Sequence, residues 1–286
     1  MRLAALMLPL LLIGAAPVQS IDWTAQRAEW NLSVAPFRVV GNVYYVGTAG
    51  ISAFLIAGDK GHVLIDGALP ESVPQIVANI RTLGFKPEDV RIILINHAHF
   101  DHAGGLAALK RLTGARLLAS AGDKPDLERG NTEGRDSLPG FMPVKVDGVI
   151  GEGSHVRLGA IDLVTHLTPG HTRGATSWSM RTAEKGKPLA VLFASSITVA
   201  GEDVTGKPPY SSAASDFRRT FASLRRMRAD VFLNFHPAAF GLDAKRAKQR
   251  GGDPMAFVDP GELARRVDEA EKGFDAELAR QRAAAK

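Results

Sequence analysis

Four side chains able to bind a metal ion fall within six consecutive positions of the chain. They are His97, His99, Asp101 and His102, in the stretch INHAHFDHAGG at residues 95–105. Side chains of an extended segment alternate, so His97, His99 and Asp101 share one side, whereas His102 falls where the chain turns into a helix. Imidazole and carboxylate are the ligands that zinc accepts when thiolate is absent, and the chain has no cysteine. The cluster therefore predicts a zinc site.

The spacing within this cluster favours two metal ions over one. Asp101 and His102 are adjacent and point differently from His97 and His99, so one ion could not readily use all four groups. Two ions, each taking two of the four, fit better. Asp101 could instead be a helix N-cap, but that role leaves three histidines among alanine, phenylalanine and glycine unexplained. Each ion then needs further ligands from elsewhere in the chain.

Two other histidines stand where strand-like runs end. His171 lies in THLTPGHTRG, a proline–glycine turn after a strand, and His236 lies in LNFHP, directly after an apolar run. Site residues often collect on loops at strand ends. Each could be an ordinary loop histidine, but the cluster favours a ligand role for both. The remaining candidates, His62, His155 and His166, lack such surroundings and are predicted to be structural.

The first half of the chain alternates between strand-like and helical patterns. Runs rich in valine, isoleucine, tyrosine and phenylalanine, separated by glycines, predict antiparallel strands within residues 37–67. Apolar spacing predicts one helix from Val73 to Leu83, ended by Gly84, and another over residues 104–114 with Leu106, Leu109 and Leu112 inward. Residues 90–96 and 115–120 read as strands. Residues 121–142 show little periodicity and are predicted to be a long loop.

The second half repeats this style. Strands are predicted near residues 144–150, 155–167, 175–182, 189–195 and 230–235, with a helix through Phe217, Phe221 and Leu224 and a final helix from about Pro260. Each half is several strands followed by helices, and no linker separates the halves. The pattern predicts one α/β domain over residues 21–286, built of two similar halves as a sandwich of two mixed sheets with helices outside.

The start of the chain has the pattern of a secretory signal peptide. Residues 1–20 combine Arg2, an apolar stretch from Leu3 to Ile13 and small residues before a cut after Ser20. The stretch is shorter than the roughly 20 residues of a membrane span, although an uncleaved anchor is the alternative. We therefore expect a periplasmic protein without a membrane anchor after processing.

Charge gives little support for a nucleic-acid partner. The net charge is +5, and its basic residues are spread apart except for one patch. That patch follows an amphipathic helical pattern and consists of Arg218, Arg219, Arg225, Arg226 and Arg228. No interleaved aromatic residues or binding motif accompany it, so we interpret it as a solvated helix face.

The motif HAHFDH, followed by PGHT and a late histidine after a strand, closely resembles that of the metallo-β-lactamase superfamily. In motif terms the resemblance runs from about Val39 to His236, and it implies a four-layer αββα sandwich that binds two Zn²⁺ per chain. The implied ligands are His97, His99 and His171 for one zinc and Asp101, His102 and His236 for the second. Asp66, at the end of VLID, matches a buried aspartate that orients the ligands; a turn aspartate is the alternative.

The residues after the strand LAVLFASS discriminate among members of this superfamily. Its thioesterases and lactonases typically carry a metal-bridging aspartate there, and two subclasses of its β-lactamases carry a cysteine. This chain has Ala194, Ser195 and Ser196 instead. It resembles subclass B3 best, which implies hydrolysis of penicillins, cephalosporins and carbapenems by a metal-bound hydroxide that Asp101 orients.

The same resemblance places hydroxyls of Ser196 and Thr198 near the substrate carboxylate, although both could simply make loop hydrogen bonds. Residues 37–51 and 122–140 are expected to flank the groove. The expected partner is a small-molecule β-lactam, and the protein is expected to be a monomer. Two alternatives stay open at this point: a lactonase or glyoxalase II-like thioesterase, and a catalytically silent metal-binding protein.

Overall fold

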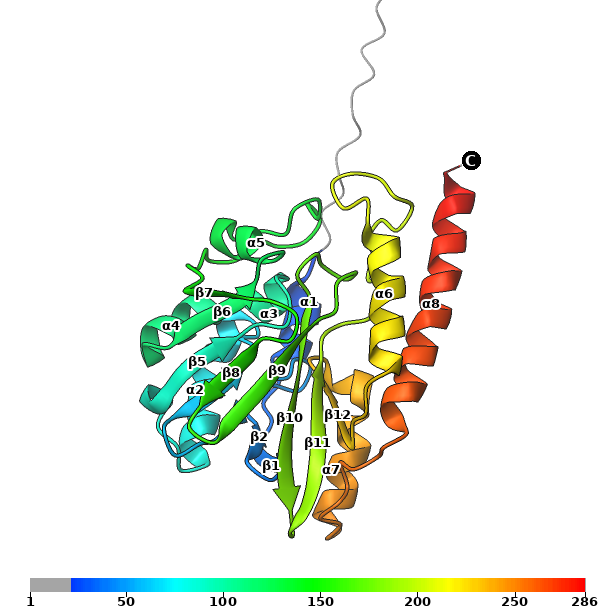
Figure 1. The fold of residues 1–286 in the computed structure, drawn as a ribbon. Helices are drawn as coiled ribbons and strands as arrows, with labels where there is room; N and C mark the ends of the chain where they lie inside the picture. Colours follow the sequence, from blue (N-terminus) through cyan, green and yellow to red (C-terminus); the bar gives the residue numbers. More distant parts are fainter. Residues whose placement is uncertain (1–21, 286) are drawn as a thin grey trace, which may run out of the picture.

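Two β-sheets face each other at the centre of the molecule, and helices lie outside both of them (Figure 1). The computed structural model describes residues 22–285, so the predicted signal peptide lies outside the described residues. Four layers in the order helix, sheet, sheet, helix confirm the predicted αββα sandwich of the α/β class.

The first sheet has seven strands, paired in chain order. They are β1 (Phe37–Val40), β2 (Val43–Tyr45), β3 (Phe54–Ile56), β4 (His62–Ile65), β5 (Val90–Leu94), β6 (Arg116–Ser120) and β7 (Gly148–Ile150). The pairs from β1 to β4 are antiparallel, and those from β4 to β7 are parallel. The strands predicted within residues 37–67 are confirmed as β1 to β4, whereas the strand predicted from residue 144 begins only at Gly148.

The second sheet has five strands, in the order β12 (Val231–Asn234), β11 (Lys187–Ala194), β10 (Thr176–Glu184), β9 (Ile161–Leu167) and β8 (His155–Leu158). All of its pairs are antiparallel except that of β11 with β12. The strand predicted over residues 155–167 is instead a hairpin, with Leu158 opposite Ile161. Gly159 makes this tight turn possible because its φ is +57°, a conformation that side chains disfavour.

The helices predicted from apolar spacing are confirmed as α2 (Val73–Thr82), α4 (Leu106–Thr113), α6 (Ala213–Arg225) and α8 (Glu262–Ala284). Leu112 was predicted to face inward, but it is 51% exposed. The buried residues of α4 are Leu106, Leu109 and Thr113, a spacing of three and then four that turns Leu112 toward solvent.

Further short helices were not predicted. They are α1 (Thr24–Trp30), α3 (Phe100–Ala103), α5 (Lys124–Arg129), α7 (Leu242–Arg250) and the 3₁₀ turns η1 (Pro70–Ser72), η2 (Pro87–Asp89) and η3 (Pro237–Phe240). The prediction of a structureless loop over residues 121–142 is wrong because α5 lies within it. A helix of six residues is too short to display a helical period. Nine-residue α7 buries only Leu242, so it has no apolar stripe to recognise.

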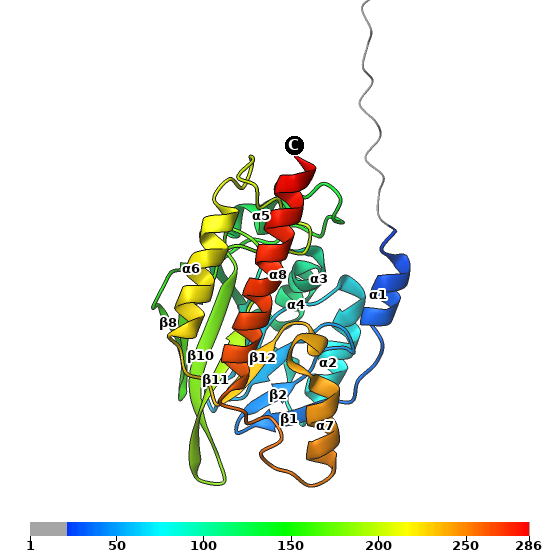
Figure 2. The ribbon, with the colours of Figure 1, turned by 90° about the vertical axis from the view of Figure 1, so that its right-hand side faces the viewer.

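Side chains of the first sheet alternate between two apolar layers. Leu55 and Ile93 pack in the layer shared with α2 and α4. Phe54 and Val63 face the second sheet, where the Phe54 ring lies 5.4 Å from that of Phe193. On the far side of the second sheet, α6 and α8 lie side by side (Figure 2). No helix within residues 22–285 has the length and hydropathy needed to cross a bilayer.

Part of the basic patch binds acidic residues of the neighbouring helix. Arg218 lies 3.1 Å from a Glu271 carboxylate oxygen, and Arg225 lies 2.8 Å from one of Asp268. Exposed pairs of this kind contribute at most about 1 kcal/mol each. Burial of the aromatic side chains between α6 and α8 is therefore the larger contribution to docking α8.

We expect Phe274→Ala to lower the free energy of unfolding by about 3–5 kcal/mol, because it leaves a cavity between the two helices. The ring is 1% exposed and lies 5.3 Å from that of Phe217 and 5.8 Å from that of Phe221. Urea denaturation measures the change. Leu112→Ala on α4 is the control and should alter stability by no more than about 0.5 kcal/mol; equal losses would contradict this account of the core.

Candidate metal centre

The candidate residues follow the ends of strands in both sheets, and three of these strands have a parallel neighbour. Asp66 follows β4, His97 follows β5, and His236 follows β12, while His171 lies in the turn between β9 and β10. The carboxyl ends of parallel strands share one edge of a sheet, where sites in α/β proteins usually form. The fold therefore brings together residues that are far apart in the sequence, such as Asp66 and His236.

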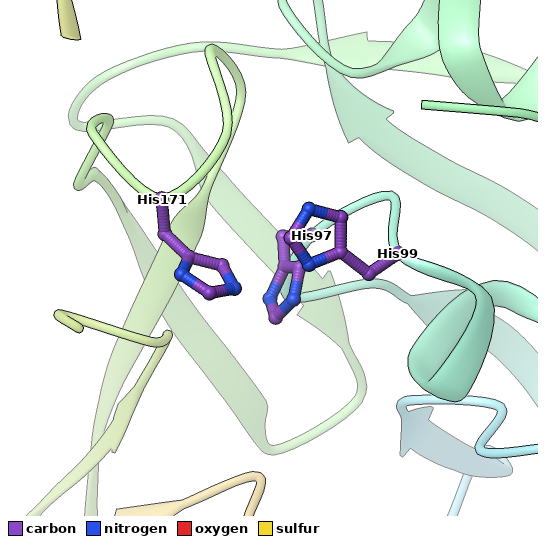
Figure 3. Close-up of side chains that lie close together, drawn as sticks. All are labelled: His97, His99 and His171. Carbon is purple, nitrogen blue, oxygen red and sulfur yellow. The ribbon is translucent and has the colours of Figure 1, made fainter. Parts of the chain in front are cut away.

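Three histidines surround one point. His97 and His99 come from the segment after β5, His171 comes from the β9–β10 turn, and their rings face one another (Figure 3). The ring centroids lie 4.4 Å (His97 to His171), 4.6 Å (His97 to His99) and 4.6 Å (His99 to His171) apart. One nitrogen from each ring lies within 4.8 Å of the other two. The arrangement could hold one cation.

A second group lies beside the first. A carboxylate oxygen of Asp101 is 3.4 Å from Nε2 of His102 and 3.4 Å from Nε2 of His236, and the two nitrogens are 3.2 Å apart. The His97 ring lies 4.3 Å from that of His102, so the two groups are adjacent. Asp101 does not cap α3: the N-cap position is His99, and it makes no side-chain capping bond.

Backbone carbonyls orient two of the rings. Nδ1 of His171 donates to the carbonyl of Thr198 at 2.7 Å, and Nδ1 of His236 donates to the carbonyl of Gly50 at 3.2 Å. A carbonyl can only accept, so the proton of each neutral ring is on Nδ1. Nε2 of each ring is therefore the nitrogen left to face the cluster, and it is the atom available as a metal ligand.

Asp66 orients a third ring and also forms a turn. Its Oδ1 accepts from the backbone N–H of Gly67 at 2.6 Å, and its Oδ2 accepts from Nδ1 of His102 at 2.9 Å. The same Oδ2 accepts from the amide of Asn96, whose oxygen accepts from Nδ1 of His97. Both roles considered for Asp66 thus occur together, at a residue with φ of +81° that aspartate tolerates.

Asn96 and Ser195 belong to this network and were not predicted as site residues. The Ser195 hydroxyl donates to the carbonyl of Asn96 at 3.1 Å. An asparagine directly after an apolar run was the available signal for Asn96, since a polar group that follows such a run tends to be buried and hydrogen-bonded. Ser195 could not be recognised in this way, because its partner is 99 positions away.

Burial keeps the three-histidine group neutral. It lowers the pKa of His171 to about 3 and holds the pKa values of His97 and His99 well below the ordinary range. Within residues 22–285, Nε2 of His97 and Nε2 of His99 are buried without a hydrogen-bond partner. Neutral imidazoles with unpaired nitrogens suit a cation such as zinc.

Charge is distributed differently in the second group. Burial opposes ionisation of Asp101, but the neighbouring His102 and His236 hold the pKa of its carboxyl well below the usual range. Burial also opposes protonation of His102, but the carboxylates of Asp101 and Asp66 outweigh it and raise its pKa to about 9. Without a metal this position attracts a proton, so a divalent cation would find a favourable potential there.

A groove of about 860 Å³ opens beside the second group. Its walls are the segment 196–201, residues around His236 and one face of α8. The segments 37–51 and 122–140, which we predicted to flank the groove, contact the histidine-bearing segments through Gly50 and Thr132. The hydroxyls of Ser196 and Thr198 are 3.1 Å apart at the edge of the groove.

The three histidines predicted to be structural bind other partners. Nδ1 of His155 lies 2.7 Å from Asp162, and Nε2 of His166 lies 2.8 Å from the Ser179 hydroxyl. The ring of His62 packs against that of Phe85. These contacts agree with leaving all three out of the ligand set.

Comparison with known proteins identifies the class. The sequence profile of the metallo-β-lactamase superfamily matches residues 46–183. A subclass B3 metallo-β-lactamase of Bradyrhizobium japonicum is 42% identical with a TM-score of 0.86, over 90% of this chain and 98% of that one. The chain therefore belongs to the metallo-β-lactamase superfamily. Within it, the chain is a hydrolase of the subclass B3 type.

Other relatives show how far the likeness extends. A metallo-β-lactamase of Cronobacter sakazakii with the motif HARLDQ is 38% identical with a TM-score of 0.85, over 90% of this chain and 99% of that one. This chain has HAHFDH at residues 97–102, so the fold alone does not determine the ligand set.

Two curated relatives have other names. A hydroxyacylglutathione hydrolase of a Methylobacterium strain is 35% identical, and the match spans 42% of this chain and only 43% of that protein. An N-acyl homoserine lactonase of Bacillus cereus is 23% identical over 68% of this chain and 82% of that protein.

We expect Asp66→Asn to weaken zinc binding about 10- to 100-fold. The NH₂ group of the new amide would face N–H groups from which the carboxylate now accepts hydrogen bonds. Asparagine keeps the size and tolerates the positive φ, so the backbone should stay in place. Titration of the metal-free protein against a chromophoric chelator measures the change. The control is Asp162→Asn, which removes the carboxylate beside His155; an equal loss there would refute the role given to Asp66.

Proposed function

We propose that the protein is a secreted β-lactamase that binds two zinc ions and hydrolyses the amide bond of penicillins, cephalosporins and carbapenems. The observation that carries the proposal is the pair of adjacent three-ligand groups at one edge of the sandwich. Likeness to a subclass B3 enzyme over 98% of its length supports it. Secretion rests on the pattern of residues 1–20 alone.

The two groups divide the ligands between the ions. His97, His99 and His171 would hold one zinc, and Asp101, His102 and His236 would hold the other. When bound, zinc supplies an activated water near neutral pH and polarises a carbonyl oxygen. Asp101 is the only carboxylate among the six, and its ionised oxygen can accept a hydrogen bond from the attacking water and so orient it.

The residues after β11 favour a lactam over the alternatives. Ala194, Ser195 and Ser196 stand where a bridging carboxylate would reduce the positive charge, and the hydroxyl of Ser195 is already bonded to Asn96. A site with one anionic ligand better stabilises a departing ring nitrogen and a substrate carboxylate. We assign that carboxylate to the hydroxyls of Ser196 and Thr198, and the groove beside them is within the usual size for small-molecule sites, roughly 300–1,000 Å³.

A lactonase is the second candidate, because the Bacillus cereus lactonase aligns over 82% of its length. Lactone and lactam differ in the leaving atom, which is a ring oxygen in one and a ring nitrogen in the other. The missing bridging carboxylate favours the lactam, whereas the shared histidines are equally compatible with both.

The purified protein with zinc should hydrolyse a chromogenic cephalosporin, a chelator should abolish the activity, and added zinc should restore it. Magnesium is the control ion, since it prefers oxygen ligands and should not restore activity. Values of kcat/KM should then be compared for a carbapenem, a homoserine lactone and S-lactoylglutathione. A lactone value far above the carbapenem value would replace the lead proposal with the lactonase.

We expect His236→Ala to lose the second zinc while the three-histidine group stays at least partly filled, so metal analysis should fall from about two ions per chain to about one. His166→Ala is the control, because its ring bonds to Ser179 away from both groups. Retention of both ions by the His236 variant would remove this residue from the ligand set.

A further inference from the structure

The carboxylate of Asp123 is hydrogen-bonded to two other segments of the chain. Its Oδ2 accepts from the backbone N–H of Ala98 at 2.9 Å and from the hydroxyl of Thr172 at 3.0 Å, and its Oδ1 accepts from the N–H of Gly174 at 2.8 Å. Ala98 stands between His97 and His99, and Thr172 follows His171. One buried carboxylate thus connects the two segments that carry the three-histidine group.

The backbone N–H and carbonyl of Ala98 both find their hydrogen-bond partners within residues 121–142. Strand β5 ends at Leu94, so Ala98 lies beyond the sheet. Its N–H donates to Asp123, and its carbonyl accepts from the Thr132 hydroxyl at 2.6 Å. Residues 121–142 therefore fix the His97–His99 segment through both backbone groups of its middle residue.

Two glycines allow the segments to meet backbone to backbone. A Cβ at Gly174 would lie 2.2 Å from the backbone nitrogen of Asp123, and a Cβ at Gly122 would lie 2.7 Å from the backbone of Arg173. The Ser120 hydroxyl also donates to the Gly174 carbonyl at 2.6 Å. The turn after β6 and the loop carrying His171 are thus in direct contact, which leaves little room for one to move relative to the other.

From this geometry we propose that Asp123 is a positioning residue, which sets the separation between the His97–His99 segment and the His171 loop and so determines the zinc affinity of that group. The inference rests on the proposed metal centre. Hydrogen bonds to an ionised acceptor are about twice as strong as neutral ones. Three such bonds converge on a residue that is 1% exposed.

The charge of Asp123 and its contacts depend on each other. Burial raises the pKa of its carboxyl to about 7, while the donors on Thr172, Gly174 and Ala98 lower it. Donors from both histidine-bearing segments thus stabilise the ionised form against the cost of burial. Loss of one donor would weaken the remaining bonds as well.

The test is zinc affinity in Asp123→Asn, which keeps the side-chain shape but turns an NH₂ group toward one of three donors. We expect the zinc affinity of the three-histidine group to fall about 10- to 100-fold. Cobalt(II) substitution gives a second readout, because its visible absorption depends on ligand geometry. Zinc affinity and the cobalt spectrum should both be measured at a temperature at which each variant is fully folded, so that partial unfolding does not lower the measured affinity.

The matched control is Asp126→Asn on α5. Asp126 is 6% exposed and binds Arg129 and the backbone N–H of Glu133, not the histidine-bearing segments. It should keep the wild-type affinity and cobalt spectrum. If Asp123→Asn does not fold, Thr172→Val removes one of the same three bonds and should lower the affinity by a smaller factor.

The outcomes separate this inference from the proposed function. Wild-type protein that binds no zinc would overturn the metal centre itself. Wild-type protein that binds zinc, with an Asp123→Asn affinity within twofold of it and the same cobalt spectrum, would overturn only the role of Asp123. Equal losses in the Asp123 and Asp126 variants would also overturn that role, since they would reflect a general disturbance of α5.

Discussion

The site depends on burying imidazole nitrogens that have no protein partner. A buried polar atom without a hydrogen bond costs about 1–3 kcal/mol, and His97 and His99 each carry one such nitrogen into the same small space. Burial keeps the pKa values of these rings low, so their lone pairs stay available rather than protonated. A bound cation would relieve this cost. The metal-free arrangement therefore has to be held in place by the rest of the fold.

The fold holds it by satisfying the opposite side of each ring and the peptides between them. Thr198, Gly50 and Asp66 each accept a hydrogen bond from one ring. These acceptors come from different strands and turns, and the two packed sheets fix their relative positions. Because β4, β5 and β6 are parallel, the turns carrying Asp66, His97 and Asp123 emerge side by side. The aromatic core of the sandwich and the docking of α8 therefore support the ligand geometry indirectly.

The features predicted correctly from the sequence are those that short segments of the chain determine. The spacing of HAHFDH and the position of His171 and His236 after strands required no knowledge of distant contacts. Helices with a long apolar stripe, such as α2 and α8, were likewise recognisable. Helix α5 was not, because it is short, and the turn at Gly159 was missed inside an apparently continuous strand. Asp123 was overlooked as a site residue because the partners of its carboxylate lie 25 or more positions away. The partner that joins Asn96 to the second group, Asp66, is likewise 30 positions away.

Chemical selectivity in this architecture depends on charge more than on shape. A lactonase and a hydroxyacylglutathione hydrolase share sequence with this chain, so the sandwich itself is compatible with several leaving groups. For the proposed metal centre, the number of carboxylates that face the six candidate ligands is the feature that we expect to discriminate between leaving groups. Asp101 would be one ligand, and Asp66 accepts hydrogen bonds from His102 and Asn96. Ala194, Ser195 and Ser196 stand where the resemblance would place a further acid. If the proposed metal centre forms, such an electron-deficient site would favour substrates that bring their own negative charge, as a β-lactam does through its carboxylate and its departing nitrogen.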